Sequence, residues 1–255
     1  MKNIWAIFKK EIKTYFTSPI AYVVITVFLV LIGFFFYSLI WFFNSQSLQL
    51  AQNQYYYQQL NINQMVYSPL FQNMSIILLL MIPLLTMRLF SEEKKINTDE
   101  LLYTCPISIN QIILGKYFAS LFVLLAMLLL TGILSIFTFA YGNPELVPIL
   151  NGYLGLFLMG AAFIAVGIFF SSLTENQIVA AILTFGTLLL FWILNWASYS
   201  AGGIWKGVLN YLSFIQHFDD MTRGILDTTD LVYYLSFIFL GLFLTHSVIQ
   251  SRRWR

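Results

Sequence analysis

Residues 117–140 read YFASLFVLLAMLLLTGILSIFTFA, a run of 24 residues with no charged side chain. Five other stretches have the same character, and the full set is 21–43, 73–90, 117–140, 152–171, 178–198 and 231–249. None contains Asp, Glu or Lys, and the single Arg, Arg88, stands near the end of the second stretch. Because a helix of roughly 20 residues crosses a hydrocarbon core of about 30 Å, each stretch predicts a membrane-spanning helix. We therefore expect an all-α membrane protein with six transmembrane helices.

The positive charges between these stretches lie on one side of the predicted membrane. If the N-terminus is cytoplasmic, the inner segments hold eleven Lys and Arg residues, whereas the outer segments hold two, Lys206 and Arg223. Cytoplasmic segments of membrane proteins carry such an excess of Lys and Arg. We expect both the N-terminus and the C-terminus to be cytoplasmic.

The composition leaves room for a single membrane domain over residues 1–255. Hydrophobic residues make up 59% of the chain and charged residues 9%, and no connection is long enough for a soluble domain. The first apolar run is longer than the core of a cleavable signal peptide and no small-residue cleavage site follows it. The one cysteine, Cys105, excludes an intrachain disulfide, and a net charge of +2 gives no reason to expect a nucleic-acid partner.

Residues 3–16 precede the first span and have the pattern of an amphipathic helix. The apolar positions are Ile4, Trp5, Phe8 and Ile12, and the lysines Lys2, Lys9, Lys10 and Lys13 lie largely on the other side. Such a helix lies in the headgroup plane with its lysines towards anionic lipid. The alternative is a basic flank that only sets the topology. Pro19 disfavours helical geometry at Ser18 and is expected to end this helix before the first span.

The most charged cytoplasmic segment is 88–116, between the second and third spans. Thr98 followed by Asp99 and Glu100 is typical of a helix start, and Pro106 is expected to stop that helix. Ser108 is then expected to begin a second helix that continues into the third span. The segment is either a rigid charged helix held between two spans or a solvated loop, and the residues alone leave both interpretations open.

The outer connections carry fewer signals. Residues 44–72 are uncharged and rich in Gln, Asn and Tyr, which suits a polar loop at the headgroup level or a docking surface for an outer partner. Residues 204–226 have the pattern of short helices that dip into the outer interface before the last span. His217 lies near Asp219 and Asp220, but these three do not point the same way on a helix, which disfavours a metal site.

Sequence motifs for catalysis and nucleotide binding are missing. The chain has no H-E-x-x-H, G-x-S-x-G, P-loop or G-x-G-x-x-G motif. Ion-coupled carriers usually place ionisable residues near the membrane midplane, and the six stretches have none there. If this protein moves something, the energy is expected to come from a cytoplasmic partner.

The chain resembles the permease subunits of ABC-2-type transporters over essentially its whole length. The matching residues are SEEKK at 91–95, TDELL at 98–102, PIS at 106–108 and LGK at 114–116, together with the basic helix and Ser18-Pro19. FTSPIAYVV at 16–24 and RGILD at 223–227 are most similar to the gliding-motility branch, with nitrous-oxide-reductase maturation permeases as neighbours.

The resemblance implies a coupling helix within residues 91–112 that sits in a groove of a separate ATPase. By this resemblance, the residues expected to contact the ATPase are Glu92, Glu93, Thr98, Glu100 and Leu101. The residues expected to define the interfacial helix are Trp5, Phe8, Lys9 and Lys10. It also implies that ATP and Mg²⁺ bind the ATPase and that this chain holds no cofactor, metal or catalytic residue. The remaining implied features are a second permease copy, an auxiliary outer-facing membrane protein, re-entrant outer helices and the bacterial inner membrane.

Two other functions compete with a permease. A membrane scaffold that transports nothing would also lack a polar pore. A membrane-embedded enzyme would need a catalytic pair within the spans, and Asn195, Ser198 and His246 are too scattered to form one.

Overall fold

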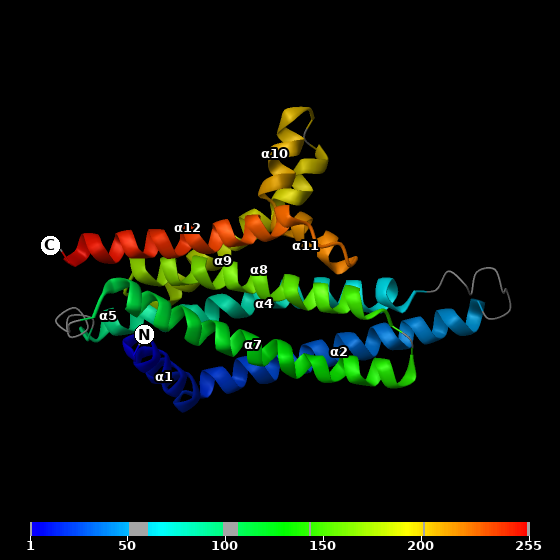
Figure 1. Cartoon of the computed structure of the whole chain (residues 1–255), viewed down its shortest axis with the longest axis horizontal. Coiled ribbons are helices and arrows are strands. Elements are labelled where there is room, and N and C mark those ends of the chain that lie inside the picture. The colour runs from blue at the N-terminus through cyan, green and yellow to red at the C-terminus, as the bar shows by residue number, and fades with distance from the viewer. Residues whose placement is uncertain (1, 51–60, 99–106, 143, 201, 254–255) are drawn as a thin grey trace.

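The computed structural model describes residues 2–50, 61–98, 107–142, 144–200 and 202–253, and throughout this part of the chain every regular element is a helix. Figure 1 shows an elongated bundle in which the start of α1 and the end of α12 lie at the same end. The elements are α1 (Lys2–Thr17), α2 (Pro19–Leu50), η1 (Asn63–Tyr67), α4 (Ser68–Thr86), α5 (Arg88–Lys95), α7 (Ile109–Tyr141), α8 (Leu146–Leu173), α9 (Gln177–Ser200), α10 (Ile204–Leu212), α11 (Phe214–Thr222) and α12 (Thr228–Arg253).

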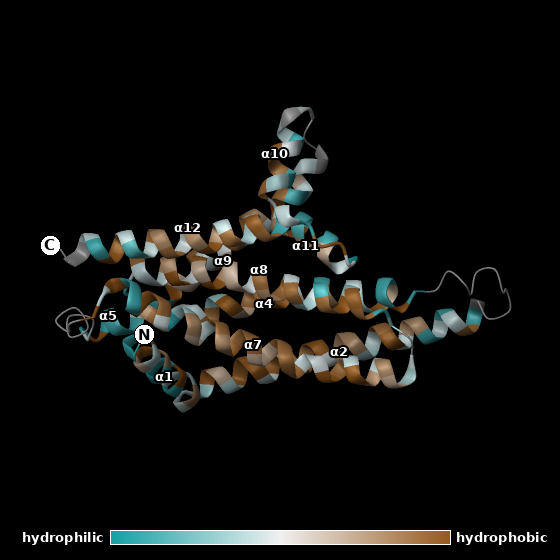
Figure 2. Ribbon diagram, viewed as in Figure 1, coloured by the Kyte–Doolittle hydropathy of each residue, from teal (hydrophilic) through white to brown (hydrophobic). Residues whose placement is uncertain are grey.

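Six helical segments in the described ranges are long and apolar enough to cross a membrane, which confirms the predicted all-α architecture. They are Pro19–Gln49, Asn63–Lys95, Ile109–Tyr141, Leu146–Leu173, Gln177–Ser198 and Thr228–Ser251. Figure 2 shows long hydrophobic stretches on α2, α7 and α8, with hydrophilic residues gathered towards the helix ends. This distribution matches a bundle whose middle faces hydrocarbon.

Helix α8 forms the centre of the bundle. It packs against α4, α5, α7, α9, α11 and α12. Glycines on α8 face bulky side chains of its neighbours: Gly152 faces Phe71, Gly160 faces Leu124 and Gly167 faces Thr86. Small residues allow membrane helices to approach closely, and here they let one helix contact most of the others.

Helix α1 ends at Thr17 and α2 begins at Pro19, as predicted from Ser18-Pro19. Helix α1 runs obliquely to α2 (Figure 1) and contacts α7 and α2. Its buried residues are Ile7 and Glu11, whereas Trp5 on the predicted apolar face is 57% exposed. The helix therefore packs through Ile7 and Glu11, and Phe8 also contacts Phe122 on α7, whereas Trp5 remains exposed.

Helical structure extends further into the connections than hydropathy predicts. In the 44–72 connection, α2 continues to Leu50 and the π-helix η1 begins at Asn63, so the predicted polar loop is wrong for these flanking residues. Tyr55, Tyr56 and Tyr57 lie outside the described residues. Hydropathy marks the part of a helix that suits lipid, and polar residues such as Gln and Asn can continue the same helix into water.

Candidate functional site

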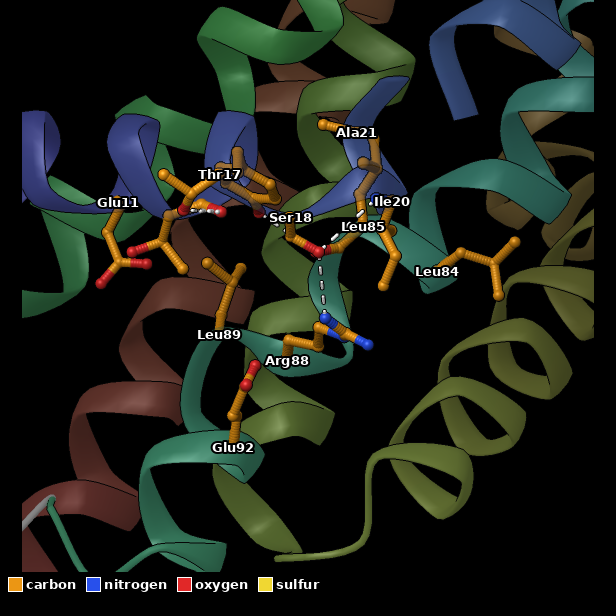
Figure 3. A pocket seen from close by; sticks show the side chains of 12 residues that line it. Glu11, Thr17, Ser18, Ile20, Ala21, Leu84, Leu85, Arg88, Leu89 and Glu92 are labelled. Carbon is orange, nitrogen blue, oxygen red and sulfur yellow. Dashed lines mark hydrogen bonds between the residues drawn. The ribbon is translucent and has the colours of Figure 1, made fainter. Parts of the chain in front are cut away.

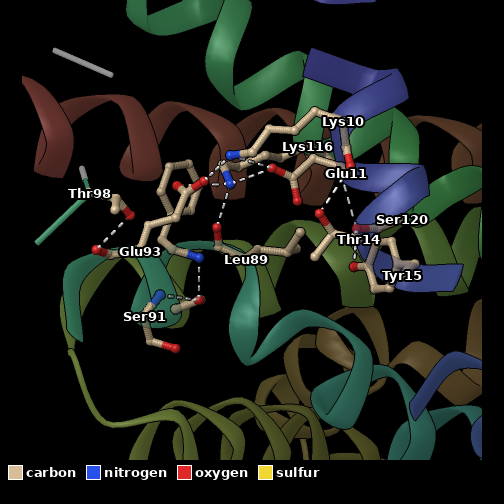
Figure 4. A network of polar contacts seen from close by, with 12 residues as sticks. Lys10, Glu11, Thr14, Tyr15, Leu89, Ser91, Glu93, Thr98, Lys116 and Ser120 are labelled. Atoms are coloured by element: carbon tan, nitrogen blue, oxygen red, sulfur yellow. Dashed lines mark hydrogen bonds and ion pairs between the residues drawn. The ribbon is translucent and has the colours of Figure 1, made fainter. Parts of the chain in front are cut away.

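A polar cluster of Lys and Glu side chains joins α1, α5 and α7 (Figure 4). Its centre is Lys116 on α7, whose side chain is 1% exposed. The Lys116 Nζ lies 2.8 Å from Glu11 Oε1 on α1 and 2.9 Å from Glu93 Oε2 on α5. It also donates a hydrogen bond of 2.6 Å to the backbone oxygen of Leu89. Three helices thus share one buried ammonium group.

Lys10 completes the cluster from the exposed side. Its Nζ lies 2.6 Å from Glu93 Oε1 and 3.6 Å from Glu11 Oε1. Partial burial would lower the pKa of the Lys10 ammonium, but the hydrogen bond and charge of Glu93 outweigh it, so this pKa is raised. Two cations now face two carboxylates. A buried charge is tolerated when it is paired in this way, and we call Lys10, Glu11, Glu93 and Lys116 the charge cluster.

Further polar contacts fix α1 against the bundle beside the charge cluster. The Tyr15 hydroxyl lies 3.1 Å from the Leu85 backbone oxygen and 3.0 Å from Ser120 Oγ. Near the start of α1, Asn3 Nδ2 donates to Gln111 Oε1 at 3.2 Å. Contacts at both ends of the helix hold it in one orientation, which a purely apolar contact would not specify.

A serine of α8 bridges the break between α4 and α5. Ser171 Oγ accepts the backbone N–H groups of Phe90 at 3.0 Å and Ser91 at 3.2 Å. It also donates to the Met87 backbone oxygen at 3.0 Å. A hydroxyl has one donor and two acceptor sites, so all its hydrogen-bonding capacity is used. The Lys94 ammonium group bonds the backbone oxygen of Ser172 in the next position. Helix α5 is thereby tied to α8.

Replacing this serine tests the bridge. Ser171→Ala leaves two buried N–H groups without their acceptor, and we expect a loss of about 1–3 kcal/mol in the free energy of unfolding. Chemical denaturation of the purified protein in detergent measures it. Ser247→Ala is the matched control, because Ser247 is exposed on α12 and bonds only within its own helix. Equal stability of the two variants would contradict the bridging role.

The structure describes three of the five predicted coupling residues. Glu93 is in the charge cluster, Glu92 is the preceding residue on α5, and the backbone N–H of Thr98 donates to the Glu93 backbone oxygen at 2.9 Å. Glu100 and Leu101 lie outside the described residues. Helix α7 follows Ser108, as predicted.

The predicted interfacial residues separate into two groups. Trp5 and Phe8 stack with ring centroids 5.0 Å apart, and the Lys9 ammonium lies 5.5 Å from the Trp5 ring. Trp5 and Lys9 are exposed, whereas Phe8 is partly buried and its ring contacts that of Phe122 on α7, with centroids 5.9 Å apart. Lys10 instead belongs to the charge cluster, so its charge serves a protein contact as well as any lipid contact.

Sequence reasoning missed Glu11, Lys116 and Ser171. The available signal was weak: Glu11 is the one acidic residue among the four lysines of residues 2–13, and Lys116 lies just before the third apolar stretch. Neither observation says that the two side chains meet.

His217, the residue considered for a metal, has other partners. Its Nδ1 lies 2.6 Å from Asp230 Oδ1 and its Nε2 lies 3.0 Å from the Tyr211 backbone oxygen. Its ring stacks on Tyr233 with centroids 4.1 Å apart. In the described part of the chain, no group of His, Cys, Asp and Glu is arranged to hold a metal ion.

The six spans described above are also the subject of a comparison between this sequence and known protein families. A family model described as ABC-2 family transporter protein matches residues 5–251. The chain belongs to the ABC-2 transporter family. A search of curated proteins gave no match. As an ABC-2 protein, it is a multi-pass membrane protein of a family whose members associate with an ABC ATPase.

Proposed function

We propose that this ABC-2 protein is the permease subunit of an ATP-driven exporter whose ATP is hydrolysed by a separate cytoplasmic ATPase. The charge cluster is the observation that carries the proposal. It joins α5, which leads into the predicted coupling region 91–112, to the interfacial helix α1 and to the span α7. A push on α5 would therefore move α1 and α7 with it.

The attachment of α5 to α8 supports the same mechanism. Ser171 and the Ser172 backbone hold α5 through contacts separate from those of the charge cluster. Because α8 contacts most of the bundle, a displacement at α5 would reach the central helix without passing through a flexible loop. We propose that ATP-driven closure of the ATPases tilts the permease through these two attachments.

The finer assignments are proposals from the resemblance. They comprise the gliding-motility branch, a second permease copy, an auxiliary outer-facing partner, the bacterial inner membrane and cytoplasmic termini. The start of α1 and the end of α12 lie at the same end of the bundle, which supports cytoplasmic termini, as does the charge distribution of the connections.

Purification tests the partner directly. A tagged full-length chain, solubilised in detergent and analysed by mass spectrometry, is expected to recover a stoichiometric P-loop ATPase. Recovery without any ATPase, under conditions in which a known ABC complex survives, would contradict the permease role and favour a scaffold.

Lys10→Gln tests coupling through the charge cluster. Glu93 keeps Lys116, so no buried carboxylate is left unpaired and the protein is expected to fold. Loss of a half-exposed ion pair costs about 1 kcal/mol or less, and we expect permease-stimulated ATP hydrolysis in proteoliposomes to fall by about two- to fivefold. Lys9→Gln is the matched control, since Lys9 is adjacent but outside the cluster. Equal rates for both variants would contradict the proposal.

A further inference from the structure

A cavity lies where α1, α2, α4 and α5 meet, next to the charge cluster (Figure 3). Its volume is about 300 Å³. One part of its wall is polar and includes Thr17, Ser18, Arg88 and Glu92, whereas another part is apolar and includes Ile20 and Leu84. The cavity therefore offers two different environments within a short distance.

Arg88 leaves hydrogen-bonding capacity unused in this cavity. Its Nη1 donates to Ser18 Oγ at 3.4 Å, which is a long hydrogen bond. Its Nε is buried and has no partner within the described residues. A guanidinium has five N–H donors in a planar fork that suits phosphate and carboxylate oxygens. Burying such a donor without an acceptor is costly, so the geometry points to an anionic group beside Arg88.

Glu92 places a negative charge on the same wall. It lies one turn after Arg88 on α5, and both side chains extend towards the junction of α1 and α2 (Figure 3). In the described part of the chain Glu92 has no ion pair within 4.0 Å. The other carboxylate of the cavity, Glu11, is already paired with Lys116 at 2.8 Å. The unused charges are thus one cation and one anion, which suit a zwitterion better than an anion alone.

The apolar wall and its position indicate a lipid. Ile20 lies in the first turn of the span α2 and is partly buried, whereas Leu84, 42% exposed, lies on the span α4. The exposed surface of α4 at Leu84 would face acyl chains. The cavity sits at the level where α1 joins the first span, which is the depth of a headgroup in the leaflet on the N-terminal side.

We infer that this cavity binds the headgroup of a phosphoethanolamine-type phospholipid. The phosphate accepts hydrogen bonds from Arg88 and Ser18, the primary ammonium pairs with Glu92, and the acyl chains follow Ile20 and Leu84 out of the cavity. The bound lipid fills the space between α1 and the spans. This inference requires membrane insertion but not ATPase coupling, so the two proposals fail independently.

Native mass spectrometry of the detergent-solubilised full chain, with any subunits that co-purify, tests the site. The protein is titrated with dioleoyl phosphatidylethanolamine, phosphatidylglycerol and phosphatidylcholine, which share the same acyl chains. We expect the ethanolamine lipid to bind most tightly. Arg88→Gln is expected to weaken its binding about tenfold, the usual cost of a lost charge-assisted hydrogen bond. Glu92→Gln is expected to remove the preference over phosphatidylglycerol.

Two further variants show whether lipid binding depends on this cavity. Arg223→Gln, an exposed arginine after α11, is the matched control and is expected to bind all three lipids as the wild type does. If Arg88→Gln does not fold, Leu84→Trp fills the mouth of the cavity without removing a charge and is expected to weaken binding similarly. Equal affinity for the three lipids, or equal effects of Arg88→Gln and Arg223→Gln, would overturn the inference. Tighter binding of phosphatidylglycerol, or equally tight binding of free phosphoethanolamine, would also overturn it.

Discussion

Lys116→Met is expected to lower the unfolding temperature on the order of 10 °C. The substitution removes a cation that is 1% exposed and leaves Glu11 and Glu93 facing each other with only Lys10 between them. Removing one partner of a buried ion pair commonly costs about 3–5 kcal/mol, because the remaining charge is neither hydrated nor paired. Tryptophan fluorescence during heating of the protein in detergent measures the shift.

Two further variants show whether charge balance is the cause. Lys206→Met makes the same substitution at an exposed position on α10 and is expected to change the unfolding temperature little. Lys116→Met combined with Glu11→Met replaces the buried pair by apolar side chains and leaves Lys10 with Glu93. We expect this double variant to recover most of the stability. A double variant less stable than Lys116→Met alone would show that the ion pair is not the reason for the loss.

Gly167→Ala is expected to destabilise the protein by about 1–3 kcal/mol, the usual cost of overpacking a core. A Cβ atom at Gly167 would lie 2.7 Å from Thr86 Cβ and closer still to Thr86 Oγ1. Thr86 is fully buried and its hydroxyl donates to the Ile82 backbone oxygen at 2.9 Å, so it has no room to move. We expect α4 and α8 to separate, with a clear fall in the denaturation midpoint.

The sign of the effect distinguishes packing from helix propensity. Gly186→Ala makes the same change on α9, where a Cβ atom would meet nothing within 4 Å. Alanine is favoured over glycine within a helix by about 0.5–1 kcal/mol, so this control is expected to be neutral or slightly stabilising. If Gly167→Ala were also stabilising, the close contact between α4 and α8 would not exist in the protein.

The architecture could be predicted because it depends on local composition. A bilayer requires each spanning segment to be apolar and to satisfy its own backbone hydrogen bonds, so the six runs predict six helices. The break at Ser18-Pro19 and the start of α7 after Ser108 were predictable for the same reason, since both follow from the geometry of one or two residues. The C-terminal end of α2 was not, because a helix can continue beyond the lipid.

The residues of the candidate site were predictable only in part. Sequence by itself determined the class of the protein, the number of spans and the segment 91–112 as the predicted coupling region. Only the tertiary structure decided that Glu11, Glu93 and Lys116 meet, that Ser171 joins α8 to α5, and that Arg88 and Glu92 share a cavity. Glu11 and Lys116 are 105 positions apart. Contact between residues so far apart in the sequence depends on how the helices pack. No local sequence pattern predicts which face of one helix contacts another.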